Sequence, residues 1–270
     1  MTYLRKTLSG PVSVEGVGLH TGVPVKMTVH PGDSGIWFRL GSERVQARPD
    51  SVSDTTRSTK LGAVGTVEHL MSAFCGLEIT DAEVELDAPE VPGLDGSSLP
   101  FIELITDIGL ETIGEHHLPD LYRRIFFQEE ELKVSVGRGT GAWRYTYATG
   151  ERWPGEQTVF IEDVVASYES EIAPNRTFTL MEEIPLIIQA GLGKGLDESS
   201  VLVLGIEGYK NDARSPEEPA RHKLLDLMGD LYLSGIPARA LSVVAERSGH
   251  RANVKVAAML LESILQPIES

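Results

Sequence analysis

The sequence predicts an α+β protein built from two similar domains, each containing a sheet and helices. The first observation is order, because strand-like segments, a helix, a strand and another helix fill the first half, and the second half repeats this order. The second is an internal echo, since residues 66–86 and 219–244 both run from a histidine-bearing helix into a strand. The length of 270 residues also suits two small domains. We therefore expect domains at 1–118 and 119–270, related by duplication.

The first half is expected to open with short strands separated by turns over residues 11–62. Residues 23–30, VPVKMTVH, illustrate the pattern, since apolar and polar residues alternate until a Pro-Gly-Asp turn breaks it. Thr66 is expected to cap a helix in which apolar residues recur at helical spacing as far as Leu77. The other elements expected here are a strand over 79–87, a helix over 101–111 and a linker over 115–120.

The second half is expected to begin with four strand-like segments and then to mix helices with strands. A helix is predicted from Pro219 to Leu233, and Gly235 follows it as a C-terminal cap. Gly229 lies inside this helix at a cost of about 1 kcal/mol relative to Ala, so we expect it to allow close packing against the neighbouring strand. The other segments expected are strands over 122–127, 131–136, 142–148, 156–161, 201–205 and 238–246, and helices over 162–171, over 181–191 and from Ala252.

Charge and composition argue against several classes of protein. The chain has 24 basic and 40 acidic residues, and this formal charge of −16 disfavours a nucleic-acid or anionic-membrane binder. A small anionic substrate stays compatible, because a few lysines dominate a cleft locally. The single cysteine, Cys75, excludes an intrachain disulfide and a thiolate zinc finger, and its place beside an apolar helix face predicts a packing residue. The sequence start lacks the apolar core of a secretory signal, and no stretch approaches ~18 apolar residues, so we expect a soluble cytoplasmic protein.

Candidate chemistry is most concentrated in RHKLLDLMGD, residues 221–230. His222 and Asp226 are four residues apart, so on a helix they point the same way and can supply two metal ligands. Asp230 follows one turn later. A His–Asp surface pair on an amphipathic helix is the alternative interpretation of this spacing.

Three further histidines outside this segment are also candidates for a catalytic or binding role. Glu68 is a candidate general base, and the adjacent His69 is a candidate metal ligand. The second histidine of a zincin motif is missing here. An exposed Glu-His pair on a helix is the alternative interpretation. His250, in the Ser-Gly-His sequence after a strand, is expected in a loop, either catalytic or solvated. His20 lies among glycines that permit close backbone approach. One ligand from the first half and two from the second would form a catalytic zinc site with an open position, flanked by Glu68.

Several stretches together resemble the UDP-3-O-acyl-N-acetylglucosamine deacetylase family, the zinc amidase of lipid A biosynthesis. The combination of TVEH with RHKxxDxxGD is specific, and the matching stretches follow the family's order over nearly the whole chain. These stretches are GVGLHTG (16–22), DTTRSTKLG (54–62), TVEHLMSAFCGL (66–77), APEVPGLDGSS (88–98), RTF (176–178), GLGKG (191–195), EEPARHKLLDLMGDLYL (217–233) and SGH (248–250).

The resemblance implies that the chain releases acetate from UDP-3-O-acyl-N-acetylglucosamine, the committed step of lipid A biosynthesis. It also implies two α+β domains packed as a sandwich with the active site between them. Zn²⁺ would be bound by His69, His222 and Asp226, and Fe²⁺ is an alternative for the same ligands. A monomer is expected.

The resemblance implies roles for the remaining site residues as well. These roles are Glu68 as the general base, His250 as the protonated group that stabilises the oxyanion and protonates the amine, Asp230 as its orienting partner, Thr177 as an oxyanion donor, Lys223 as a phosphate contact, Phe178 as a lining residue, and His20 and Lys194 as substrate-binding residues.

The sequence also departs from the family pattern in the region after Lys194. The segment GKGLDESSVLVL is shorter than is usual there, which leaves the preferred acyl length open. A zinc de-N-acetylase for a different nucleotide sugar or acylated amine is therefore the alternative function. A non-catalytic paralogue is disfavoured, because the candidate catalytic groups are all present. Pro185 fits only the first turn of the helix expected in this region, so that helix should start late.

Overall fold

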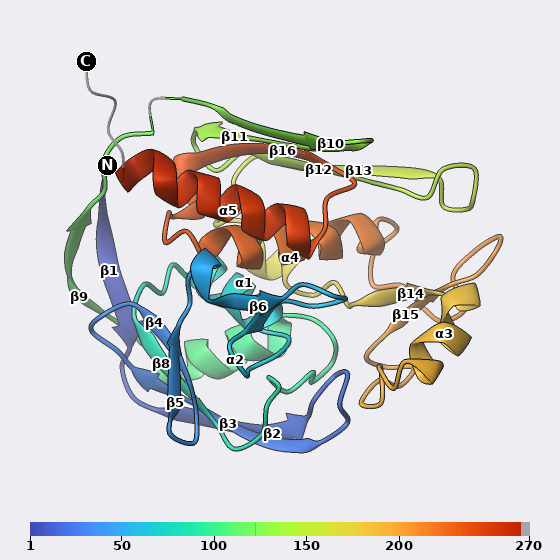
Figure 1. Ribbon diagram of the computed structural model, residues 1–270, viewed down its shortest axis with the longest axis horizontal. Coiled ribbons are helices and arrows are strands. Elements are labelled where there is room, and N and C mark those ends of the chain that lie inside the picture. The colour runs from blue at the N-terminus through green and yellow to red at the C-terminus, as the bar shows by residue number, and fades with distance from the viewer. Residues whose placement is uncertain (122, 266–270) are drawn as a thin grey trace.

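The computed structural model describes residues 1–121 and 123–265, and it is a layered α+β molecule. Two five-stranded sheets form the outer layers, and the main helices lie between them (Figure 1). The buried side chains of both sheets and of the helices form one continuous apolar core. This arrangement confirms the predicted fold class of two sheet-plus-helix units.

The first sheet has the strand order β2-β3-β8-β4-β5. Buried side chains alternate with more accessible ones along β3 and β8, as a sheet with one face on the core requires. Its strands are β2 (Val12–Val17), β3 (Pro24–Pro31), β4 (Ile36–Leu40), β5 (Glu43–Gln46) and β8 (Ala82–Leu86).

The second sheet repeats this topology with the order β10-β11-β16-β12-β13. In each sheet the strand that comes last along the chain lies in the middle, antiparallel to one neighbour and parallel to the other. The shared topology agrees with the predicted duplication, whereas a domain boundary at residue 118 stays a prediction. The strands are β10 (Ile125–Glu129), β11 (Leu132–Arg138), β12 (Trp143–Ala148), β13 (Glu156–Ile161) and β16 (Leu241–Glu246).

Four helices fill the space between the sheets, namely α1 (Glu68–Leu77), α2 (Leu99–Ile108), α4 (Glu218–Tyr232) and α5 (His250–Leu265). Helix α1 packs directly against α4. Gly229 allows this contact, because a Cβ at that position would overlap the carbonyl oxygen of Glu68. The prediction that Gly229 packs against a strand is therefore wrong, since its close neighbour is the backbone of α1.

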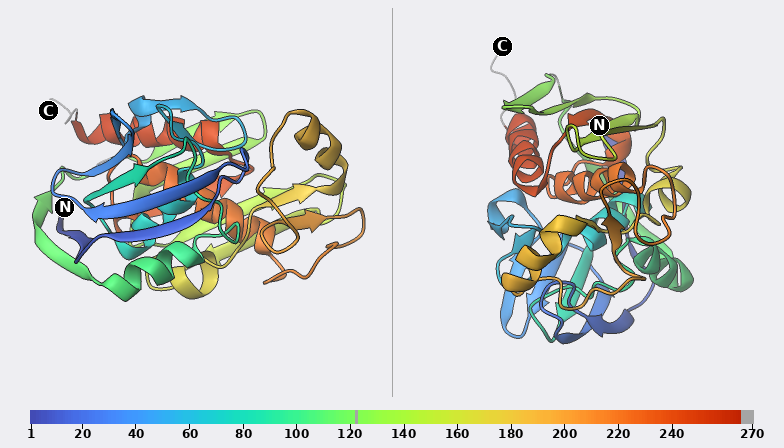
Figure 2. Two further views of the ribbon diagram at one scale, coloured as in Figure 1. Left: turned by 90° about the horizontal axis from the view of Figure 1, so that it is seen from below. Right: turned by 90° about the vertical axis from the view of Figure 1, so that its right-hand side faces the viewer.

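Several further elements complete the fold. The segment containing β14, α3 and β15 projects at the end away from the N-terminus (Figure 2). Strands β1 and β9 form an antiparallel ribbon. The bounds are β1 (Thr2–Leu8), β6 (Val52–Asp54), β7 (Lys60–Leu61), β9 (Leu110–His117), β14 (Phe178–Leu180), β15 (Leu202–Leu204), α3 (Ile184–Gln189), 3₁₀ turns at Pro49–Ser51, Met181–Glu183 and Ala238–Ala240, and a π-helical turn at Tyr168–Ile172.

Two expectations for the middle of the chain are wrong. Residues 115–117 of the predicted linker instead continue β9, whose His117 pairs with Thr2 of the unpredicted strand β1, whereas 118–120 have no regular structure. The preceding helix ends at Ile108 because Gly109 has a φ of +82°, which an α-helix cannot continue. Position 122, the start of one predicted strand, lies outside the described residues.

The helix expected over 162–171 is a turn followed by the π-helical turn. The Asp163 carboxylate accepts the backbone N–H groups of Val165 and Ala166, which closes a local turn instead of a regular helix. The helix predicted near 181–191 is confirmed in shortened form as α3, with Pro185 in its first turn as expected.

The prediction that Thr66 caps the first helix is wrong. Helix α1 begins at Glu68 after Val67, and the Thr66 hydroxyl donates to Glu90 Oε1 (2.8 Å) instead of capping the helix. The last helix begins at His250, two residues before the predicted start.

Cys75 is buried in the core as expected, and burial raises the pKa of its thiol. No helix within the described ranges has the length and apolar composition that crossing a membrane requires.

Candidate active site

A cavity of about 500 Å³ lies between the two units and holds nearly all the predicted site residues. One part of its lining is polar and comes from α1, α4 and the start of α5. Another part is apolar and comes from β14, α3 and β15, including Leu180, Ile184, Ile187 and Val203. The lining includes the predicted residues His20, Glu68, His69, Thr177, Phe178, His222, Lys223, Asp226 and His250.

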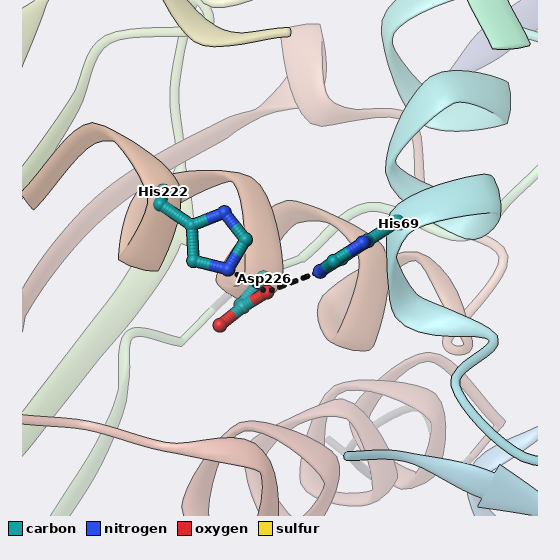
Figure 3. Close-up of side chains that lie close together, drawn as sticks. All are labelled: His69, His222 and Asp226. Carbon is teal, nitrogen blue, oxygen red and sulfur yellow. Dashed lines mark ion pairs between the residues drawn. The ribbon is translucent and has the colours of Figure 1, made fainter. Parts of the chain in front are cut away.

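Three buried side chains converge at the polar part of this cavity (Figure 3). Asp226 Oδ1 lies 3.5 Å from His69 Nε2 and 3.4 Å from His222 Nε2. One ligand atom from each residue lies within 4.8 Å of the other two. Although buried, Asp226 Oδ1 has no hydrogen-bond partner among the described residues. A buried acceptor facing two imidazole nitrogens is the arrangement that a divalent cation satisfies.

The ionisation of these groups also suits a metal. Burial lowers the pKa of His222 to about 3, so this imidazole is neutral and able to donate a lone pair. Its Nδ1 faces the Asn175 carbonyl oxygen at 3.1 Å, which fixes Nε2 as the free nitrogen. Burial alone would raise the pKa of Asp226, but neighbouring cations, including the Lys223 ammonium 2.8 Å away, hold it well below its ordinary value. Two imidazole nitrogens and one carboxylate oxygen are a donor set that catalytic zinc sites use.

Glu68, the first residue of α1, lies on the same side of the cavity as the histidines. Its Oε2 accepts the backbone N–H of Thr59 (2.9 Å), and its Oε1 lies 3.9 Å from His250 Nε2. Burial raises the pKa of Glu68, with His250 acting in the opposite direction. A buried carboxylate with a raised pKa is suited to accept a proton near neutral pH.

His250 is paired with a buried carboxylate behind the cavity. Its Nδ1 lies 3.0 Å from Asp230 Oδ2, which also accepts the Asn253 side-chain amide at 3.0 Å. Burial alone would lower the pKa of His250, but the carboxylates, Asp230 first, raise it to about 9. His250 is the first residue of α5, so the expectation of a loop position is wrong. The helix start aims its ring between Glu68 and Asp226.

We expect Asp230→Asn to move the alkaline limb of the pH–rate profile to lower pH. Activity that requires protonated His250 is lost as pH rises through its raised pKa of about 9. Removing one opposite charge within hydrogen-bond distance lowers such a pKa by about one to three units. The measurement is kcat against pH for both proteins at equal metal content. An alkaline limb that stays in place would show that Asp230 does not set the charge of His250.

The substrate-binding candidates occupy different places around this core. The Phe178 ring packs near the His222 ring, and the Lys223 ammonium nitrogen lies 5.7 Å from the centre of the Phe178 ring. The Lys223 ammonium donates to Asp226 Oδ2 (2.8 Å), a contact that the predicted phosphate role does not include. Thr177 lies on the cavity wall, next to the buried ion pair of Arg176 with Glu218 (2.9 Å).

Lys194 does not lie with the other candidates. Its side chain is exposed and is not part of the cavity lining, although its backbone N–H donates to the His20 carbonyl (3.3 Å). Glu90 holds the same loop from the other side, since it accepts the backbone N–H groups of His20 and Thr21 (both 2.8 Å).

Four residues that support the site had no role in the sequence-based predictions. Asn175 and Glu90 position histidines, as described above. Thr59 and Asn253 both donate to Asp230. Thr59 lies within the matching stretch DTTRSTKLG, and Asn253 follows His250 by three residues on one helix, so both were accessible to sequence reasoning once a site was assumed.

Comparison with known proteins gives a consistent result over nearly the whole chain. A family model described as UDP-3-O-acyl N-acetylglycosamine deacetylase matches residues 5–262. The UDP-3-O-acyl-N-acetylglucosamine deacetylase of Chromobacterium violaceum is 35% identical over 284 residues, covering 96% of this chain and 91% of that protein. The proteins of the same name from Methylococcus capsulatus and Trichormus variabilis are 36% and 33% identical, covering 96% and 95% of this chain and 90% and 98% of their own lengths. The chain therefore belongs to the UDP-3-O-acyl-N-acetylglucosamine deacetylase family.

Proposed function

We propose that this chain hydrolyses the N-acetyl group of UDP-3-O-acyl-N-acetylglucosamine, releases acetate and thereby serves lipid A biosynthesis. The observation that carries the proposal is the buried cluster of His69, His222 and Asp226, with Glu68 and a cationic His250 facing the same cavity. Amide hydrolysis needs a nucleophile, a base, stabilisation of the oxyanion and a proton for the amine. One cavity of this protein contains candidates for all of these functions.

We propose that His69, His222 and Asp226 hold Zn²⁺. Two observations support this assignment: Asp226 Oδ1 lacks a hydrogen-bond partner among the described residues, and His222 is neutral. When bound, zinc supplies a Lewis acid that lowers the pKa of water to about 7 and polarises an amide carbonyl. Fe²⁺ is accepted by the same donor types, so the preferred metal is set by availability as well as by these ligands.

Glu68 and His250, whose facing atoms are 3.9 Å apart, then divide the proton transfers between them. Glu68 takes a proton from the attacking water at Oε1, since Oε2 is already held by Thr59. His250 stabilises the developing negative charge and delivers its Nε2 proton to the departing amine. Asp230 keeps His250 cationic and correctly oriented through Nδ1. Thr177 is the proposed additional donor to the oxyanion.

The apolar wall of the cavity is proposed to receive the 3-O-acyl chain. Phe178, Leu180, Ile187 and Val203 offer a continuous apolar surface beside the polar cluster. Lys223 is proposed to contact the phosphates, and His20, which lines the cavity, to bind the substrate. The Lys223 ammonium also donates to Asp226, so it is proposed to contact both a metal ligand and the substrate from one position. Lys194, which is exposed and outside the cavity lining, is proposed to act only on parts of the substrate that extend out of the cavity.

The proposal includes a monomer acting in the cytoplasm. All the residues named above come from one chain, so the site does not need a second copy. The nucleotide part of the substrate supports a cytoplasmic location, because activated nucleotide sugars are made inside the cell.

A substrate panel tests the proposed specificity. We expect acetate release from UDP-3-O-(3-hydroxyacyl)-N-acetylglucosamine, and a much lower kcat/KM for UDP-N-acetylglucosamine, which cannot occupy the apolar wall. An inert UDP-sugar lacking the N-acetyl group serves as the background control. Equal kcat/KM values with and without the acyl chain would favour the alternative, a de-N-acetylase for a different nucleotide sugar or acylated amine.

A further inference from the structure

Thr59 lies at the contact between α1 and α4, directly behind the polar part of the cavity. It ends the loop between β6 and β7, and its side chain is fully buried. It does not line the cavity, so it does not touch a substrate. The roles proposed above leave this buried hydroxyl unassigned.

Each polar group of Thr59 is engaged by a different part of the site. The backbone N–H donates to Glu68 Oε2 (2.9 Å), and the side-chain hydroxyl donates to Asp230 Oδ1 (2.6 Å). The carbonyl oxygen accepts the backbone N–H of Val67 (3.1 Å), immediately before α1. A single residue therefore connects the proposed base on α1 with the carboxylate on α4 that holds His250.

These contacts determine which oxygen of each carboxylate is available to the reaction. With Oε2 held by Thr59, Glu68 presents Oε1 towards His250 Nε2 (3.9 Å). With Oδ1 held by the hydroxyl, Asp230 presents Oδ2 to His250 Nδ1 (3.0 Å). Proton transfer depends on such alignment, and a displacement of about 1 Å can reduce a rate about 100-fold.

We propose that Thr59 is a positioning residue that holds Glu68 and the His250–Asp230 pair in one mutual geometry. The proposal rests on the function proposed above, since it concerns the groups that transfer protons. It predicts an effect on kcat that depends on the hydroxyl. KM and metal affinity should be unaffected, because within the described ranges the hydrogen bonds of Thr59 go to Glu68, Asp230 and Val67 and to no metal ligand.

The test compares Thr59→Val with Thr59→Ser, using Thr56→Val as a matched control. Valine has the shape of threonine but lacks the hydroxyl, so we expect kcat to fall about 10- to 100-fold, the range for losing a hydrogen bond to a charged group. Thr59→Ser keeps the donor and should restore most of the rate. Thr56, in the same loop, donates its hydroxyl to Asp54 Oδ1 (2.8 Å) at the exposed surface, so its replacement should leave kcat unchanged.

Zinc content, KM and thermal unfolding are measured for each variant alongside kcat. Folded Thr59→Val with wild-type kcat would overturn the inference, as would an equal loss in Thr56→Val. Thr59→Ala removes the same hydroxyl without its bulk and replaces the valine variant if that protein does not fold. Failure of both to fold, while Thr59→Ser folds, would assign the hydroxyl to stability and overturn the positioning role. Absence of acetate release from wild-type protein would instead refute the function proposed above.

Discussion

Replacing Asp226 or His222 by Ala is expected to abolish both zinc binding and acetate release. Each substitution removes one of only three proposed protein ligands, and Asp226 contributes the single carboxylate of the set. Two remaining ligands do not hold a catalytic zinc ion against a competing chelator. The measurement is zinc content after dialysis, together with acetate release at saturating substrate.

Arg221→Ala provides the matched control for these ligand variants. Arg221 precedes His222 on the same helix, but its guanidinium is bound to Glu171 near the surface (3.0 Å). We expect this variant to retain both zinc and activity. Full turnover by a metal-free Asp226→Ala or His222→Ala protein would refute the metal site itself.

Replacing His250 by Ala is expected to lower kcat by about 10²- to 10⁴-fold, the usual contribution of a positioned general acid. The Nε2 of His250 lies 3.9 Å from both Glu68 Oε1 and Asp226 Oδ2, so it faces the reacting region without approaching Asp226 as closely as the proposed ligands do. Zinc content should therefore change little. The experiment measures kcat, KM and bound zinc in the same preparation.

His30→Ala tests whether any loss is specific to the site. His30 is another histidine paired with a carboxylate, Glu85 (3.1 Å), but it lies partly exposed on β3. The His30→Ala variant should therefore have the same kcat as the unmodified protein. Strong loss of zinc from His250→Ala would instead make His250 a ligand, contrary to the role proposed here.

Local patterns in the sequence predicted the two main sheets and the helices that carry the site. The alternation in β3 and the helical spacing in α1 and α4 are consequences of one buried face, so they are visible in a single sequence. Strand β9 has almost no buried residues, and without an alternating pattern it resembles a linker. Its pairing with β1 joins residues more than 100 positions apart, which local patterns do not report.

The sequence predicted which residues to consider for the site, including the His250–Asp230 pair, but not most of the contacts between them. The four-residue spacing of His222 and Asp226 places both on one face of α4, whereas the approach of His69 depends on the close packing of α1 at Gly229. That packing was expected against a strand. The ion pair between Lys223 and Asp226 also required the structure, because the sequence equally allows an outward-pointing lysine.

Acetate release from UDP-3-O-(3-hydroxyacyl)-N-acetylglucosamine, measured before chelation, after chelation and after zinc re-addition, tests the central claim most directly. We predict that the protein releases acetate, that the chelator stops this release and that zinc restores it. Release that continues in folded, metal-free protein would contradict the role of the His69–His222–Asp226 cluster. No release from folded, zinc-loaded protein would contradict the proposed reaction.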